Sequence, residues 1–221
     1  GNYINVERMS FNGLQRKGKL EKKENLSAYV ENEIFTINMN NDKMEMELNK
    51  IGIKGPHNTY NSMAAGIAST ASGISKAKIR EALSGFQGVE HRLESVAYVR
   101  NVHFINDSKA TNVDAAWYAL ECQTRPVVWI AGGKDKGISF DELGPEICKH
   151  VKSLYVTGMT AEKIRQATQN AENYSEALPI HVMEDFRETV LAAAAEAEDG
   201  DVVLLSPAST SFDKFANFEE R

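Results

Sequence analysis

The segment VHFINDSKATNVDAAWYALECQTRPVVWIAGG, residues 102–133, decides the fold of the second half of the chain. Its apolar run Val102–Asn106 predicts a strand, its period near 3.6 over Val113–Glu121 predicts a helix, and Val127–Ala131 predicts a second, buried strand. The same alternation continues toward the end of the chain, with strands predicted at 154–157, 180–183 and 202–205. Helices are predicted at 141–150, 161–168, 185–197 and 213–220.

Strands that alternate with helices at this spacing favour an α/β fold with a mostly parallel sheet and right-handed crossovers. We therefore predict an α/β domain with a mostly parallel sheet in this part of the chain. Its loops after the strands should open on a single rim, where open α/β sheets bind ligands.

The first part of the chain has a different pattern. A charged stretch at 16–25 predicts a surface turn, and period-two alternation at 28–30, 33–39 and 44–48 predicts strands of a hairpin or meander. Helical spacing then begins at Asn58 and predicts a helix that ends near Gly73, followed by a short helix at 75–83. Gly85 and Gly88 mark a domain boundary, so the predicted domains are residues 1–89 and 90–221.

Composition excludes several classes of protein. Hydrophobic residues make up 42% of the 221 residues and charged residues 25%, as in ordinary globular proteins, while a net charge of −6 disfavours a duplex nucleic-acid binder. Cys122 and Cys148 lack CxxC spacing, which excludes a cysteine-rich zinc site and fits a reducing compartment. No apolar run is long enough to span a bilayer. The chain starts without an initiator methionine or a signal-peptide pattern, so we expect a fragment of a longer protein.

Known nucleotide and metal motifs are missing. GxGxxG, GxxxxGK[ST] and HExxH do not occur, and the histidines show no metal-site spacing. A dinucleotide oxidoreductase is therefore disfavoured.

Three loops that follow strands carry chemistry: residues 106–112, 132–137 and 206–213. In the first, Asp107 and Lys109 could hold ribose hydroxyls, phosphate or Mg²⁺; alternatively, Asp107 caps the next helix and Lys109 is solvated, which these residues alone favour. In the second, Lys134 and Lys136 beside two glycines could bind an anion or could simply be exposed.

The third loop is rich in hydroxyl groups and runs into the helix predicted from Asp213. Free N–H groups and the helix dipole would favour a carboxylate or phosphate there, and ordinary capping by Ser211 or Asp213 is the alternative. In the first domain, Asn58 and Asn61 lie one helical turn apart and could face one ligand, or Asn58 could be an N-cap.

Together these segments resemble the Mur ligase family, and within it the ligases that add D-glutamate. The resemblance covers roughly residues 50 to 221. It rests on Phe104–Asn112, on Leu205–Ala208 with Ser211–Asp213, Phe215, Asn217–Glu219 and Arg221, on His91-Arg92, and on His57-Asn58 with Asn61.

The resemblance implies a three-domain enzyme of which this chain is a part. Residues 1–89 would be the end of the central ATPase domain and 90–221 the C-terminal Rossmann-like domain, with the phosphate loop and main magnesium ligands upstream. The chain alone would then be inactive, and no metal ligand is expected in it.

The resemblance also implies residue roles. The implied nucleotide contacts are Asn58, Asn61, Arg92, Asp107, Lys109 and Thr111. The implied D-glutamate contacts are Thr111, Lys136, Ser211, Phe212 and Phe218, with Lys109 and Lys136 as catalytic residues. Phe212 departs from the aliphatic residue common in the family at this position.

The implied activity is an ATP-dependent amide ligase that uses Mg²⁺ and adds D-glutamate to UDP-N-acetylmuramoyl-L-alanine through an acyl phosphate, during peptidoglycan precursor synthesis. It would be a cytoplasmic monomer that neither binds nucleic acid nor inserts into membranes. The alternative is a non-catalytic Rossmann-like module that binds an acidic small molecule.

Overall fold

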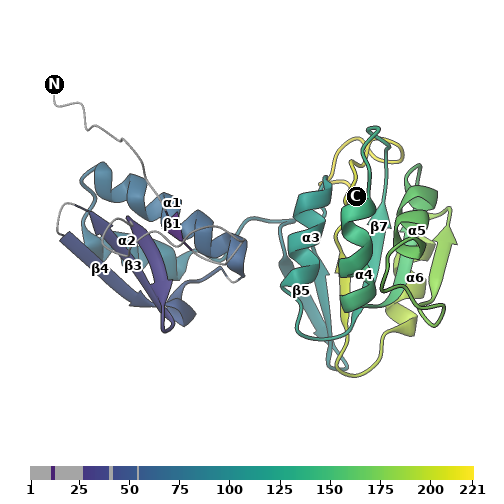
Figure 1. Ribbon diagram of the computed structural model, residues 1–221, viewed down its shortest axis with the longest axis horizontal. Helices are drawn as coiled ribbons and strands as arrows, with labels where there is room; N and C mark the ends of the chain where they lie inside the picture. Colours follow the sequence, from purple (N-terminus) through teal and green to yellow (C-terminus); the bar gives the residue numbers. More distant parts are fainter. Residues whose placement is uncertain (1–10, 13–26, 40–41, 54) are drawn as a thin grey trace. The chain divides into compact units, whose positions relative to one another are not determined.

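The computed structural model describes residues 11–12, 27–39, 42–53 and 55–221, which form two compact units, Gly1–Gly88 and Val89–Arg221 (Figure 1). The surface turn predicted at 16–25 lies outside the described residues. No helix among the described residues is long and apolar enough to cross a membrane.

The first unit is a small sheet with two helices. Its strands β1 (Phe11–Asn12), β2 (Ala28–Glu31), β3 (Ile34–Met39) and β4 (Asp42–Glu47) lie in that order, with β1 parallel to β2 and the other pairs antiparallel. A 3-10 turn, η2 (Leu48–Lys50), precedes α1 (Pro56–Ala71) and α2 (Lys76–Gly85). The predicted meander and both predicted helices are confirmed.

Gly66 brings α1 close to the sheet in this unit. A Cβ at this position would lie 2.1 Å from the Ile37 Cδ1 atom, so a larger residue would require the end of the Ile37 side chain to move. The buried core between helices and sheet is made by Ala28, Phe35, Ile37, Met44, Ile51, Met63, Ile67 and Ile79.

The second unit is built on a six-stranded sheet of order β5-β6-β10-β7-β8-β9. The strands are β5 (Glu94–Val99), β6 (Val102–Asn106), β10 (Val202–Leu205), β7 (Val127–Gly132), β8 (Val151–Thr157) and β9 (Ile180–Met183). Every neighbouring pair is parallel except β5 with β6. The predicted α/β fold with a mostly parallel sheet is confirmed.

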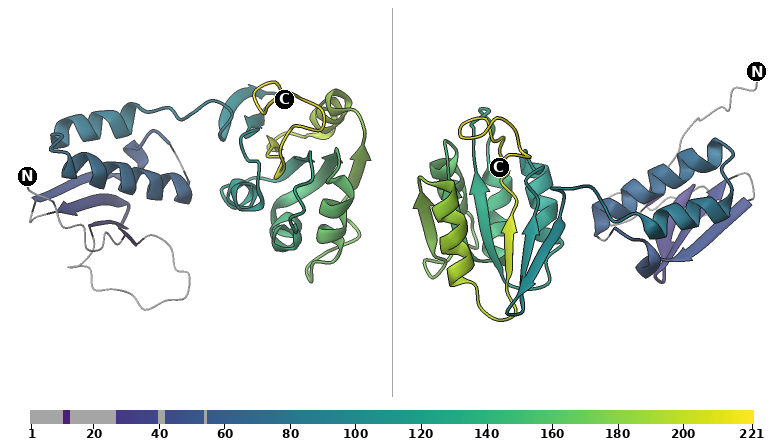
Figure 2. Two further views of the ribbon diagram at one scale, coloured as in Figure 1. Left: turned by 90° about the horizontal axis from the view of Figure 1, so that it is seen from above. Right: turned by 180° about the vertical axis from the view of Figure 1, so that it is seen from behind.

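Helices cover both faces of this sheet. On one face lie α3 (Val113–Glu121), α4 (Gly144–His150) and α5 (Ala161–Gln169), and on the other lies α6 (Phe186–Glu196) (Figure 2). Alternate residues of β7 serve the two layers: Trp129 and Ala131 pack with the first set, and Val128 and Ile130 with α6. The strand is buried along its whole length, which explains its continuous apolar sequence.

Several details differ from the sequence predictions. The strand β5 was not predicted; it joins β6 through Arg100 and Asn101, which both have positive φ, as in a tight hairpin turn. The helix predicted at 141–150 begins as the 3-10 turn η3 (Asp141–Leu143), and α4 starts at Gly144, followed by a proline. The strand predicted from Leu154 begins at Val151.

The helix predicted at 213–220 is wrong, because this segment forms successive turns. One helical turn forms where Lys214 and Phe215 donate N–H bonds to the Ser211 carbonyl. Beyond it side chains replace the helical ladder: Ala216 N–H donates to the Glu220 carboxylate at 2.7 Å, and Glu220 N–H donates to the Asn217 side chain at 2.7 Å.

Candidate functional site

Strand β10 lies between β6 and β7, so the three loops singled out in the sequence meet at one rim of the second unit. Gly132 N–H donates to Pro207 O at 2.8 Å, and Lys134 N–H to Thr210 O at 2.7 Å. The Ser206 hydroxyl donates to Asp107 Oδ2 at 2.7 Å. The expectation that all three loops open on the same rim is confirmed.

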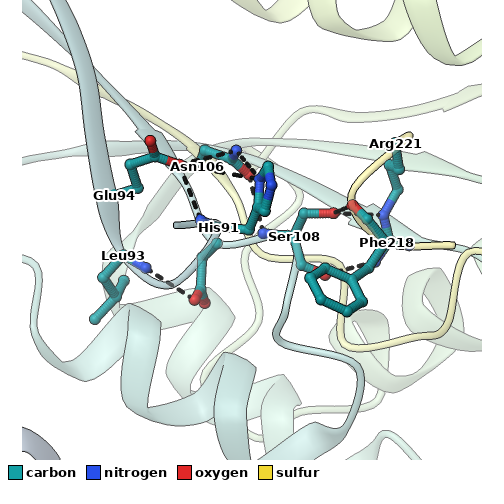
Figure 3. Close-up of polar contacts among 8 residues, drawn as sticks. His91, Leu93, Glu94, Asn106, Ser108, Phe218 and Arg221 are labelled. Carbon is teal, nitrogen blue, oxygen red and sulfur yellow. Dashed lines mark hydrogen bonds and ion pairs between the residues drawn. The ribbon is translucent and has the colours of Figure 1, made fainter. Parts of the chain in front are cut away.

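Asp107 is a buried carboxylate at the centre of this rim, with 4% of its surface exposed. Besides Ser206, it accepts a hydrogen bond from Leu93 N–H at 3.1 Å (Figure 3). Burial raises its pKa to about 6, although the Ser206 hydroxyl, the Leu93 N–H and the Arg92 charge each act to lower it. Asp107 does not cap α3: Asn112 does so, by accepting from Ala115 N–H at 2.8 Å.

Lys109 and Phe218 lie together, although the sequence resemblance assigns them to different ligands. The Lys109 ammonium lies 5.3 Å from the centre of the Phe218 ring, a cation–π distance. The His91 ring meets the same phenyl ring edge-on at 5.9 Å, and its Nδ1 is 2.9 Å from the Asn106 amide nitrogen (Figure 3). His91 O accepts from Lys109 N–H at 2.9 Å, so this histidine fixes the Lys109 backbone.

The end of the chain is tied to this rim through Ser108 and Arg221. The Ser108 hydroxyl donates to Phe218 O at 2.7 Å (Figure 3). The Arg221 guanidinium donates to the Ser108 hydroxyl at 3.0 Å, to Ser108 O at 2.7 Å and to Ser209 O at 3.1 Å. Burial lowers the Arg221 pKa to about 10, partly offset by the negative charge of Asp213.

The glycine loop approaches its neighbours too closely for any side chain. Gly132 has φ 111° and Gly133 has φ 149°, and added Cβ atoms would lie 1.9 Å from Thr157 O and 2.2 Å from Thr210 O respectively. Downstream of this turn, the Lys136 side chain is exposed and donates to Thr111 O at 3.2 Å. Lys136 and Thr111, from different loops, are thus brought together.

The loop after β10 does not lead into a helix. The expected helix start beside Ser211 is therefore wrong, while anion binding by this loop stays a prediction. The Ser211 side chain is 2% exposed, while Phe212 is 60% exposed. The loop is fixed to the end of β8, because the Lys214 ammonium donates to the Thr157 hydroxyl at 2.9 Å and to the Glu184 carbonyl.

The remaining predicted residues lie apart from these loops in sequence. Asn58 is the third residue of α1, whose N-cap is Gly55, so the interpretation of Asn58 as an N-cap is wrong. Asn61 donates to the Asn58 amide oxygen at 3.5 Å, and both belong to the first unit. Arg92 is exposed at the start of the second unit.

Three further polar residues at the rim are buried and were not assigned a role from the sequence: Ser108, Thr160 and Ser209. Ser108 and Ser209 lie in the first and third of the loops singled out from the sequence, whereas Thr160 lies outside them. Within the described ranges, no three His, Cys, Asp or Glu side chains gather closely enough to hold a metal ion.

Comparisons with known proteins all find Mur ligases. The family model described as "Mur ligase, glutamate ligase domain" matches residues 91–209, just over half of the chain. A protein of Christiangramia forsetii named UDP-N-acetylmuramoylalanine--D-glutamate ligase is 44% identical over 202 residues, which are 91% of this chain and 44% of that protein. A protein of the same name from Salinibacter ruber is 45% identical over 181 residues, 81% of this chain and 38% of that protein. The chain therefore spans less than half the length of these relatives.

Solved structures share the fold at low sequence identity. MurF from Acinetobacter baumannii has a TM-score of 0.62 at 17% identity, covering 90% of this chain and 44% of that one. UDP-N-acetylmuramate-alanine ligase MurC from Thermotoga maritima has a TM-score of 0.60 at 16% identity, covering 82% and 42%.

Proposed function

The chain belongs to the Mur ligase family, and from this premise we propose that it is part of the enzyme that adds D-glutamate to UDP-N-acetylmuramoyl-L-alanine. The observation that carries the proposal is the rim where three loops converge around Asp107, Lys109 and Lys136. The names of the relatives supply the substrate pair. Residues 1–89 are proposed to be the end of a central ATP-binding domain, and 90–221 a C-terminal domain that binds D-glutamate and nucleotide.

D-glutamate is proposed to bind between the glycine loop and the loop after β10. Its two carboxylates need cations and hydrogen-bond donors. Lys136 provides an exposed ammonium that makes one bond to a neutral carbonyl, Thr111 O, and is free to turn toward a carboxylate. Thr111, Ser211, Phe212 and Phe218 are proposed to complete this site.

Nucleotide is proposed to contact Arg92, Asp107, Lys109 and Thr111 in the second unit, and Asn58 and Asn61 in the first. Arg92 and Lys109 provide positive charge for phosphate groups. Each Asp107 oxygen already accepts one hydrogen bond, and a carboxylate oxygen has a second lone pair that suits a ribose hydroxyl. The contact of Lys109 with the Phe218 ring would couple the nucleotide and amino-acid sides.

The proposed reaction joins two anionic partners. The substrate carboxylate attacks the γ-phosphate of ATP, giving an acyl phosphate and ADP; the amine of D-glutamate then attacks the acyl carbon and phosphate leaves. Lys109 and Lys136, the proposed catalytic residues, would neutralise charge and orient the reactants. Mg²⁺ would neutralise phosphate charge, and no ligand for it is proposed among the described residues.

We further propose that the complete enzyme is a cytoplasmic monomer that acts on peptidoglycan precursors. The complete protein, supplied with ATP, Mg²⁺ and UDP-N-acetylmuramoyl-L-alanine, should release phosphate and form an amide with D-glutamate but not with L-glutamate. The 221-residue chain alone should form none. D-glutamate binding without any ligation by the complete protein would favour a non-catalytic binding module instead.

A further inference from the structure

Thr160, in the turn between β8 and α5, has a buried hydroxyl that is not used in the usual way. It occupies the N-cap position of α5 and is 0% exposed, yet its side chain makes no capping bond to its own helix. An N-cap threonine ordinarily accepts from a backbone N–H of the helix that it begins. Here the Thr160 hydroxyl accepts from Gly133 N–H at 3.1 Å and lies 3.0 Å from the Ser209 hydroxyl.

These two contacts join the loops that carry the proposed D-glutamate contacts. Gly133 lies three residues before Lys136, and Ser209 lies two residues before Ser211. Thr160 N–H also donates to Gly133 O at 3.1 Å, so both its backbone and its side chain hold the glycine loop.

The rest of the turn is packed just as closely. Gly158 has φ 75°, and a Cβ there would lie 2.4 Å from Asp213 Oδ2 and 3.0 Å from Gly133 N. Met159 N–H donates to Asp213 Oδ2 at 3.4 Å. The turn after β8 therefore contacts the glycine loop on one side and the loop after β10 on the other.

We propose that Thr160 is a positioning residue for the amino-acid substrate, because its hydroxyl sets the spacing between the backbone that carries Lys136 and the backbone that carries Ser211. D-glutamate presents two carboxylates at a limited separation, so its binding depends on the distance between the groups that receive them. This inference rests on the proposed function. It adds Thr160 to the residues proposed to matter for D-glutamate, although Thr160 itself contacts neither substrate.

The test is a pair of substitutions in the complete ligase. Thr160→Val keeps the side-chain volume and removes the hydroxyl, whereas Thr160→Ser keeps the hydroxyl. Thr160→Val should raise the KM for D-glutamate about three- to tenfold, which is about 0.7 to 1.4 kcal/mol, with the KM for ATP changed less than about twofold. Thr160→Ser should restore most of the loss.

A matched control lies on the same helix. Thr168 is also 0% exposed, and its hydroxyl donates to Ile164 O at 2.9 Å, within α5. Thr168→Val removes a buried hydroxyl without touching either loop, so it should leave the KM for D-glutamate unchanged. If Thr160→Val fails to fold, Ser209→Ala removes the other end of the contact and should raise the same constant.

Three results would overturn the inference: an unchanged KM for D-glutamate in the folded Thr160→Val and Ser209→Ala variants, equal rises for D-glutamate and ATP, or a Thr160→Ser variant as impaired as Thr160→Val. The wild-type ligase separates this inference from the proposed function. Absence of D-glutamate-dependent ligation in wild type would refute the function itself.

Discussion

Replacing Asp107 with asparagine should change the stability of the second unit in a pH-dependent way. The stability of the variant minus that of wild type should be larger at pH 8 than at pH 4.5. The structure places the carboxylate in a buried site, with a pKa raised from 3.8 to about 6. The folded protein therefore holds this proton more tightly than the unfolded chain. The neutral acid stabilises the fold below about pH 4, and this contribution is lost as the pH rises through about 6.

The size of the effect follows from the two pKa values. At about 1.4 kcal/mol per pH unit, the rise from 3.8 to about 6 corresponds to at most about 3 kcal/mol. Asparagine has no charge to bury. At pH 4.5 the carboxyl of the unfolded chain is already mostly ionised, so the stability of Asp107→Asn minus that of wild type should increase by about 2 kcal/mol between pH 4.5 and pH 8. Any packing difference between the two side chains is independent of pH and cancels.

Urea unfolding followed by tryptophan fluorescence measures this difference. Both tryptophans of the chain, Trp117 and Trp129, lie in the second unit, so their signal reports that unit alone. Trp129 is fully buried, and its indole N–H donates to the backbone oxygen of Ser206 at 2.9 Å. The side chain of the same serine donates to Asp107.

Asp201 provides a control, because asparagine at this position is expected to destabilise the second unit at pH 8 and not to stabilise it. It is as buried as Asp107, with 3% exposed, but accepts from the Lys152 ammonium at 3.0 Å. Asp201→Asn breaks this ion pair and should destabilise the unit at pH 8. The reasoning on Asp107 would be refuted if the stability of the variant minus that of wild type were the same at both pH values. It would also be refuted if this difference became smaller as the pH rises.

Three further predictions concern the second unit. Gly133→Ala should lower the stability of the second unit and weaken D-glutamate binding at least tenfold, measured by urea unfolding and steady-state kinetics, because its Cβ would lie 2.2 Å from Thr210 O. Arg221→Ala should speed proteolysis near the end of the chain, seen by mass spectrometry, since three hydrogen bonds tie this guanidinium to the rim; wild-type cleavage rates would contradict this. Cys122 should react with iodoacetamide at pH 8 at least tenfold more slowly in the folded chain than in urea, because burial, together with the negative charges of Glu121 and Asp107, raises its pKa to about 11; equal rates would argue against it.

The sheet and most of its helices were predictable because their signals are local. A strand buried on both faces, such as Val127–Gly132, requires a continuous apolar run, and the helix that begins at Val113 has an asparagine at its N-cap. The strand β5 was missed because a register shift between Ser95 and Ala97 interrupts its alternation.

The convergence of the site loops was predictable for a general reason, namely that carboxyl ends of parallel strands share one rim. Their mutual contacts were not, because they join residues far apart in sequence. Arg221 reaches Ser108, and Thr160 reaches Gly133 and Ser209, and no periodic pattern in the sequence encodes either contact. The final helix was predicted wrongly because its side chains compete for the backbone groups that a helix needs.

The central claim is that this rim receives D-glutamate, and a pair of lysine substitutions in the complete enzyme tests it most directly. Lys136→Ala removes the ammonium proposed to bind a carboxylate, and a charge-assisted hydrogen bond contributes about 1.5–3 kcal/mol, or about ten- to a hundredfold in the KM for D-glutamate. Lys134→Ala is the control, since its structural contact with Thr210 O is made by the backbone N–H. The account predicts a large rise for Lys136→Ala alone, with the KM for ATP little changed. Equal effects of the two substitutions, or a rise in the KM for ATP in place of that for D-glutamate, would contradict it.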